Sequence, residues 1–283
     1  MIRPSHILNL ACEDRPGIVA AVTTALAGLG ANIIESNQFW DQATNRFFMR
    51  IAFDARGSDT AALQTGLAPA IERFGMDARL TDTATRQRII IMVSRFDHAM
   101  LHLLYQIRVG WLDAEVAAIV SNHDDSRDTA NAHAIPYHHW PVDRANKAEQ
   151  EARLRALVAE SKADLVVLAR YMQVLSNDLS RALSGRVINI HHSFLPSFKG
   201  AKPYHQAHER GVKLIGATAH YVTPDLDEGP IIEQETERVS HAMSADDFVA
   251  VGRDIESRVL ARAVKLHLEQ RVTLSGNKTI VFA

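Results

Sequence analysis

The sequence is poor in cysteine, with Cys12 as its only one among 283 residues. A single cysteine excludes an internal disulfide and a zinc site built from several cysteines. We expect Cys12 to be a small buried residue at a strand end rather than a nucleophile. A reduced cysteine, together with an N-terminus that does not resemble a signal peptide, predicts a cytoplasmic protein.

The sequence also lacks an excess of either charge and lacks long apolar runs. It has 31 Lys and Arg against 33 Asp and Glu, a formal net charge of −2. This balance gives no electrostatic case for binding nucleic acid or an anionic membrane. Apolar runs such as 89–94 are as long as a strand and far too short to span a membrane. The 47% hydrophobic and 23% charged residues are typical of a globular protein, and the length suggests about two domains.

Residues 1–83 predict a ferredoxin-like domain of β-α-β-β-α-β order. The expected segments are 6–11, 18–29, 32–39, 46–53, 59–74 and 76–81. Asp14 is expected to cap the first helix and Pro16 to occupy its first position. Gly28 and Gly30 follow a helix, so we expect them to end it rather than to form a dinucleotide-binding fingerprint, which must follow a strand.

Two short blocks in this region resemble an ACT domain, a regulatory module of amino-acid metabolism. They are Asp14-Arg15-Pro16-Gly17-Ile18-Val19 and Gly30-Ala31-Asn32-Ile33. ACT domains usually pair side by side and bind an amino acid at the N-terminus of the first helix, where free N–H groups suit a carboxylate. The resemblance implies an amino-acid effector at Asp14, Gly17 and Asn32, and a homodimer or homotetramer. A purely structural dimerisation domain is an equal alternative.

Residues 84–283 predict a larger, Rossmann-like α/β domain with a mostly parallel sheet, after a polar linker over 81–87. Strand patterns alternate with helical ones, and an antiparallel pair, a long helix and a closing hairpin follow. The expected strands are 88–94, 115–121, 137–142, 164–169, 187–190, 214–222 and 230–239; the helices are 97–107, 147–161 and 244–270; the hairpin covers 271–282 and turns at Gly276-Asn277.

The strand beginning at Val187 carries a candidate site at its C-terminal end, the edge where open α/β sheets bind ligands. Asn189 and His191 project to the same face because side chains alternate along a strand. The acidic turn 223–229 could bring a carboxylate to His191 if it folds back. An amide, an imidazole and a carboxylate suit attack on a carbonyl, with oxyanion stabilisation and proton transfer. A satisfied polar pair and a solvated hairpin are the alternatives.

Histidines are plentiful, but their spacing does not indicate a metal site. Neighbours such as His138-His139 and His191-His192 point to opposite faces of their strands, which is poor ligand geometry. We therefore expect no metal and no cofactor.

Several separated blocks resemble the formyltransferase fold of folate-dependent enzymes. They are Asn189-Ile190-His191, Ser193-Phe194-Leu195-Pro196, Phe198-Lys199-Gly200 and 225–232, Asp-Leu-Asp-Glu-Gly-Pro-Ile-Ile. An ACT-like domain joined to this fold is similar to the arrangement of the formyltetrahydrofolate deformylases. The resemblance implies catalytic roles for Asn189, His191 and Asp227. It also implies that a loop after the fourth strand grips the pterin through Arg170, Met172, Gln173, Val174 and Leu175, and that His220 lines the pocket.

One departure from the formyltransferase pattern favours hydrolysis over transfer. The ribonucleotide transferases of this family have a glycine-rich loop after the first strand that holds the acceptor phosphate. This sequence has Ser94-Arg95-Phe96-Asp97-His98, without glycine. His98 is therefore expected at the substrate, with a helix N-terminal residue as the alternative. The resemblance implies hydrolysis of 10-formyltetrahydrofolate to formate and tetrahydrofolate.

Other functions fit less well. The first alternative is formyl transfer to a small amine, because water and an amine could attack the same carbon. An amino-acid-sensing protein with an inactive transferase domain is a further alternative from a different class. Transfer to methionyl-tRNA is not expected, because the sequence has no basic C-terminal extension.

Overall fold

The computed structural model describes residues 4–55, 57–195 and 203–282. Pro196, Phe198 and Gly200, which belong to the formyltransferase-like blocks, lie outside the described residues. The chain forms two compact units. The first comprises Met1–Arg86 with Gln270–Thr273 and Ile280–Ala283, and the second comprises Gln87–Glu269 with Leu274–Thr279.

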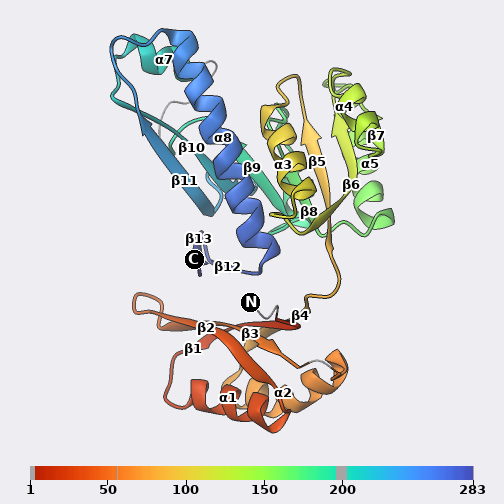
Figure 1. Ribbon diagram of the computed structural model, residues 1–283, viewed down its shortest axis with the longest axis vertical. Helices are drawn as coiled ribbons and strands as arrows, with labels where there is room; N and C mark the ends of the chain where they lie inside the picture. Colours follow the sequence, from red (N-terminus) through yellow and green to blue (C-terminus); the bar gives the residue numbers. More distant parts are fainter. Residues whose placement is uncertain (1–3, 56, 196–202, 283) are drawn as a thin grey trace. The chain divides into compact units, whose positions relative to one another are not determined.

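The first unit has the predicted β-α-β-β-α-β order. Its elements are β1 His6–Glu13, α1 Ile18–Gly28, β2 Asn32–Asp41, β3 Arg46–Asp54, α2 Thr60–Phe74 and β4 Asp77–Asp82. The strands form an antiparallel sheet of order β2-β3-β1-β4, and α1 and α2 lie together beside it in Figure 1. Alternate residues of β3, including Met49, Ile51 and Phe53, pack with α1 and α2 in one buried core, as the period of two along a strand requires.

The start of α1 differs from the prediction. Gly17, not Asp14, occupies the N-cap, with a φ of 96°, and no side chain caps the helix. The backbone N–H of Asp14 instead donates to the carbonyl of Asn45 at 3.0 Å. The expected cap was wrong because the left-handed turn at Gly17, which favours glycine, places Asp14 and Pro16 before the helix. The predicted end is confirmed, since Gly30 follows with a φ of 71° and its N–H donates to the Ala27 carbonyl.

The second unit is built on a seven-stranded sheet. Its elements are β5 Gln87–Val93, α3 His98–Arg108, β6 Ala114–Ser121, α4 Arg127–Ala132, β7 Tyr137–His139, α5 Lys147–Glu160, β8 Leu165–Leu168, α6 Asn177–Ala182, β9 Val187–His191, α7 Pro203–Glu209, β10 Leu214–Tyr221, β11 Ile231–Arg238 and α8 Ala245–Leu268. The sheet order is β11-β10-β9-β8-β5-β6-β7. Strands β5 to β9 pair in parallel, and β10 and β11 are antiparallel. The predicted fold class is thus confirmed.

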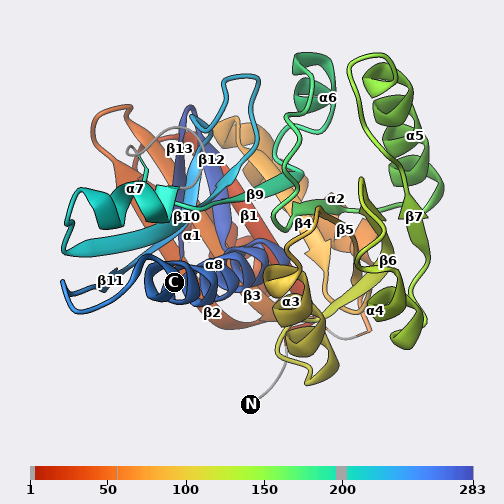
Figure 2. The ribbon, with the colours of Figure 1, turned by 90° about the horizontal axis from the view of Figure 1, so that it is seen from above.

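Helices cover both faces of this sheet. Figure 2 shows α3 and α8 on one side and α5 and α6 on the other. Leu154 and Val158 of α5 and Leu179 of α6 share a buried core with residues of β5, β8 and β9. The long helix α8 begins with the expected Ser244 cap, which forms a capping box with Asp247. The closing hairpin is also confirmed as β12 Val272–Ser275 and β13 Lys278–Val281.

Three short helices were not predicted, namely α4, α6 and α7. They have only six or seven residues, too few for an apolar period to show. The strand predicted over 137–142 is shorter in the structure, where β7 ends at His139, because Pro141 has no N–H to continue the ladder. No helix of the described part of the chain is long and apolar enough to cross a membrane.

Candidate active site

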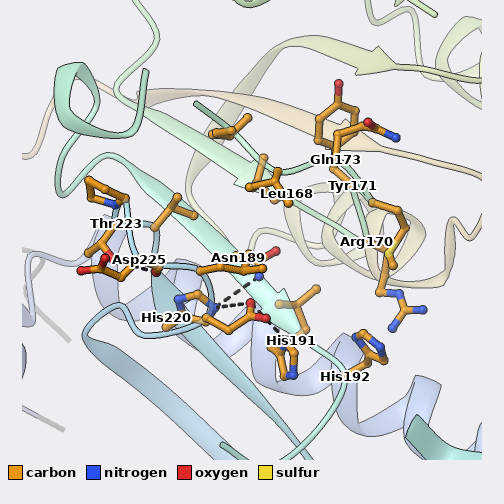
Figure 3. A pocket seen from close by; sticks show the side chains of 18 residues that line it. Leu168, Arg170, Tyr171, Gln173, Asn189, His191, His192, His220, Thr223 and Asp225 are labelled. Atoms are coloured by element: carbon orange, nitrogen blue, oxygen red, sulfur yellow. Dashed lines mark hydrogen bonds and ion pairs between the residues drawn. The ribbon is translucent and has the colours of Figure 1, made fainter. Parts of the chain in front are cut away.

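A cavity of about 220 Å³ lies at the C-terminal ends of β8 and β9. Its walls come from residues within three segments, namely 168–175 from the last residue of β8 onward, 189–192 at the end of β9, and 220–227 from the end of β10 onward. Figure 3 shows Asn189, His191 and His220 gathered at one end, with Arg170 and His192 beside them. The cavity lies at the edge where parallel α/β sheets bind ligands.

The acidic turn after β10 folds back over the end of β9. Gly229 makes this possible, because a Cβ at that position would overlap the carbonyl oxygen of Tyr221. The Tyr221 N–H donates to the Pro230 carbonyl at 2.9 Å, which closes the turn. Asp227 lies inside the turn with a φ of 58°, a left-handed conformation that aspartate tolerates better than most residues. Its carboxylate therefore points back towards the strand ends.

The returning turn places Asp227 against His191. His191 Nδ1 donates to Asp227 Oδ1 at 3.2 Å, and this hydrogen bond holds the pKa of the Asp227 carboxyl below its ordinary value despite partial burial. Asp227 is therefore a carboxylate at neutral pH. The other nitrogen of His191, Nε2, is buried and has no hydrogen-bond partner among the described residues. A buried polar atom of this kind needs a partner, and a substrate atom in the cavity could supply one.

The register of the sheet brings His220 opposite Asn189. His220 Nδ1 lies 2.9 Å from the carbonyl of Tyr221, which can only accept, so Nδ1 carries the proton. His220 Nε2 is then the acceptor for Asn189 Nδ2 at 3.2 Å. Burial lowers the pKa of His220, which keeps this tautomer neutral. The side-chain amide of Asn189 is thereby fixed with one N–H on His220 and the second N–H available to a ligand.

Residues 170–175 form the wall opposite the turn. Met172 and Val174 are more than half exposed, whereas Leu175 is buried. Arg170 adds a positive charge near His192. Burial, and then the charges of Arg170 and His191, lowers the pKa of His192 to about 4. His192 is thus an uncharged ring beside two basic groups.

The arrangement suits polar attack on a small carbonyl group. An amide N–H and an imidazole can stabilise an oxyanion, and an adjacent carboxylate can orient a nucleophile. No group of three or more His, Cys, Asp or Glu side chains within residues 4–55, 57–195 and 203–282 has the geometry to hold a metal ion.

Comparison with known proteins identifies the family. The family model of the formyl transferases matches residues 87–264, and that of the ACT domain matches residues 6–62. A formyltetrahydrofolate deformylase from Bacillus subtilis is 49% identical over 278 residues, which is 97% of this chain and 93% of that protein. The chain belongs to the formyltetrahydrofolate deformylase family.

Solved structures agree with membership of the deformylase family. A formyltetrahydrofolate deformylase from Pseudomonas syringae superposes with a TM-score of 0.97 at 47% identity, covering 100% of this chain and 96% of that one. A glycinamide ribonucleotide transformylase from Symbiobacterium toebii matches with a TM-score of 0.63 at 30% identity, covering 70% of this chain and 95% of that one. The formyl transferase model covers the second unit of this chain, which agrees with the resemblance seen in the sequence.

The structure brings most of the predicted site residues of this deformylase-family chain to the cavity. Those that line it are Asn189, His191, Asp227, His220, Arg170, Met172, Gln173, Val174 and Leu175. His98 does not line it. It begins α3, and its Nε2 lies 2.8 Å from Glu256 Oε2 on α8, which agrees with the alternative of a helix N-terminal residue.

The three predicted effector residues are not brought together within one chain. Gly17 is the N-cap of α1, close to Asp14 in the chain, whereas Asn32 pairs with Asp54 at the far end of β3. Glu13, next to Asp14, pairs with Arg46 at the near end. Eight residue steps along β3 separate the two ends, which is about 26 Å. Asn32 of the same chain therefore cannot contact a ligand at the start of α1.

Two buried groups near the cavity were missed from the sequence, Glu256 and Tyr204. Tyr204 donates its hydroxyl proton to Glu256 Oε1 at 2.8 Å, and Arg170 Nη1 lies 3.1 Å from the same oxygen. The sequence did hold a signal for Glu256. It lies within the apolar pattern of a long helix, beside Ile255, Val259 and Leu260, and a glutamate on a buried face needs partners.

Proposed function

We propose that this protein hydrolyses 10-formyltetrahydrofolate to formate and tetrahydrofolate. One observation carries the proposal. Asp227 contacts His191 beside the side-chain amide of Asn189, whose orientation is fixed, and all three residues line the same cavity. The names of relatives that are 40–49% identical support the same reaction, so the transferase alternative is not favoured.

The proposed reaction begins with the pterin docked against the loop 170–175. Asp227 accepts a hydrogen bond from a water molecule and draws a proton from it as the water oxygen attacks the formyl carbon. The free N–H of Asn189 and the Nε2–H of protonated His191 stabilise the oxyanion. The tetrahedral intermediate then collapses, the bond between carbon and N10 breaks, and a proton from His191 reaches N10. The products are formate and tetrahydrofolate, and no other acceptor takes part.

The test is to mix the purified protein with 10-formyltetrahydrofolate and to measure formate and tetrahydrofolate. We expect the two products in equal amounts without any added amine. Tetrahydrofolate formation that depends on an added amine, with no formate, would support transfer instead and contradict the proposal. Folate binding without turnover would support an inactive, amino-acid-sensing protein.

We further propose that the first unit binds a small amino acid. The N-cap of α1, Gly17, has no side chain to cap the first-turn N–H groups, which suits a ligand carboxylate, and Asp14 is close enough in sequence to meet the ammonium group. Calorimetric titration with glycine and with methionine tests this idea. Binding that is lost in Gly17→Val would support it, because valine disfavours the left-handed turn. Absence of heat with both ligands would favour a purely structural unit.

A further inference from the structure

A buried carboxylate outside the proposed reaction joins three separate parts of the second unit. Glu256, on α8, is 1% exposed. Its Oε1 accepts hydrogen bonds from Arg170 Nη1 at 3.1 Å and from the Tyr204 hydroxyl at 2.8 Å, and its Oε2 accepts one from His98 Nε2 at 2.8 Å. These partners come from the loop after β8, from α7 and from the start of α3.

Glu256 is ionised in this network. Burial alone would raise the pKa of the Glu256 carboxyl, but the hydrogen bond from His98 and the charge of Arg170 outweigh it, so the pKa lies below its ordinary value. A buried carboxylate is tolerated only with such partners, and removing its charge would leave Arg170, whose side chain is 12% exposed, without its counter-ion.

Among the described partners of Glu256, Arg170 alone lines the cavity, and its backbone is unusual. It has a φ of 64°, which costs energy in a residue other than glycine and persists only where surrounding contacts enforce it. The Arg170 carbonyl accepts from the Ser94 N–H at 3.3 Å, and the Met172 N–H donates to Ser94 Oγ at 3.0 Å. Ser94 thus holds the backbone of the loop 170–175, and Glu256 holds its first side chain.

We infer that Glu256 is a positioning residue for the folate substrate, acting through Arg170. Its carboxylate fixes the guanidinium and, with Ser94, sets the conformation of the loop 170–175 before the substrate arrives. The inference rests on the proposed function, because this loop is the one proposed to hold the pterin. None of the described residues of α8 lines the cavity. The inference therefore gives α8 an indirect part in substrate binding.

The decisive experiment compares Glu256→Gln with Tyr204→Phe. Glutamine keeps the shape but not the charge, so we expect the KM for 10-formyltetrahydrofolate to rise between about 10-fold and 100-fold, with kcat within about threefold, because loss of preorganisation weakens binding. Phenylalanine removes one hydrogen bond from the same oxygen but leaves the Arg170 pair. It should lower the thermal midpoint and keep the KM within about twofold of the wild-type value.

A double-mutant cycle separates positioning from general stability. If Glu256 acts through Arg170, then Glu256→Gln changes KM by less than about twofold in an Arg170→Met background. Additive effects, or an unchanged KM in folded Glu256→Gln, would overturn the inference. Should Glu256→Gln fail to fold, Glu256→Asp serves instead, since it keeps the charge but withdraws the carboxylate, and an unchanged KM there would likewise overturn the inference.

Tetrahydrofolate affinity is measured beside turnover in each variant. A wild-type protein that binds tetrahydrofolate but releases no formate would contradict the proposed function alone. In that case the same pattern is expected in the Kd of tetrahydrofolate, weaker in Glu256→Gln and unchanged in Tyr204→Phe. Equal Kd values in all three proteins would overturn the positioning role.

Discussion

At the scale of single residues, the site depends on which groups are charged and which are not. Asp227 is held as a carboxylate by His191, whereas His220 is neutral and takes one N–H of Asn189. An ionised Asp227 can orient water, and Nε2 of neutral His220 can only accept a hydrogen bond from the amide. The remaining N–H of Asn189 is therefore available for a developing oxyanion.

Replacing Asp227 by asparagine tests the role of this carboxylate. We expect Asp227→Asn to lower kcat by at least about 100-fold, the usual cost of removing a group that acts in the transition state. The matched control is Glu228→Gln, which removes the neighbouring, exposed carboxylate of the same turn and should keep full activity. A kcat for Asp227→Asn close to that of the control would remove Asp227 from the proposed reaction.

His192 gives the folded protein a specific dependence on pH. Its pKa is about 4 in the folded state against an ordinary value of 6.5, so the unfolded chain binds the extra proton first. The contribution of neutral His192 to the free energy of unfolding is complete above pH 6.5 and is lost as the pH falls towards 4. Between pH 6.5 and 5 the loss is about 1.5 kcal/mol. Urea unfolding measures the free energy of unfolding at the two pH values. Its decrease from pH 6.5 to pH 5 should be smaller in His192→Gln than in the wild type by that amount. An identical decrease in both proteins would disprove the lowered pKa of His192.

The sequence allowed prediction of the residues that meet within the cavity but not of those that support it. Asn189 and His191 lie two positions apart on one strand, so their common face follows from the period of two, and the resemblance to the formyltransferases pointed to Asp227. Glu256 lies 86 residues from Arg170 along the chain. No local pattern can predict so distant a pair.

At the scale of the elements, tight turns decide where the site residues point. The strands of the second unit were predictable because their β-branched, apolar runs are distinctive. The three missed helices were not, because each has fewer than eight residues. The acidic turn 223–229 was predictable only in part. Its place in the chain follows from the sequence, but its return over β9 depends on the close approach of Gly229 to Tyr221.

Adding a methyl group at Gly229, two residues after Asp227, should therefore lower the activity by displacing Asp227. In Gly229→Ala the new Cβ would overlap the Tyr221 carbonyl, so the turn must shift and carry Asp227 with it. We expect kcat/KM to fall about 100-fold, as for a misplacement of about 1 Å. Gly28→Ala is the control, because its Cβ would have nothing within 4 Å. Wild-type kcat/KM in Gly229→Ala would show that the turn does not position Asp227.

At the scale of the whole molecule, the fold alone does not determine the reaction. The chain resembles the Symbiobacterium toebii transformylase over 70% of its length, and one fold commonly hosts several functions. The feature of the sequence that led us to expect hydrolysis is local. The loop between β5 and α3, residues 94–97, has no glycine, and His98, the first residue of α3, contacts Glu256.

The source of the second formate oxygen tests the central claim most directly. The protein is incubated with 10-formyltetrahydrofolate in water enriched in oxygen-18, and the formate is analysed by mass spectrometry against a sample without protein. If water attacks the formyl carbon, each enzymatically released formate carries one labelled oxygen. Release of tetrahydrofolate without labelled formate would contradict hydrolysis.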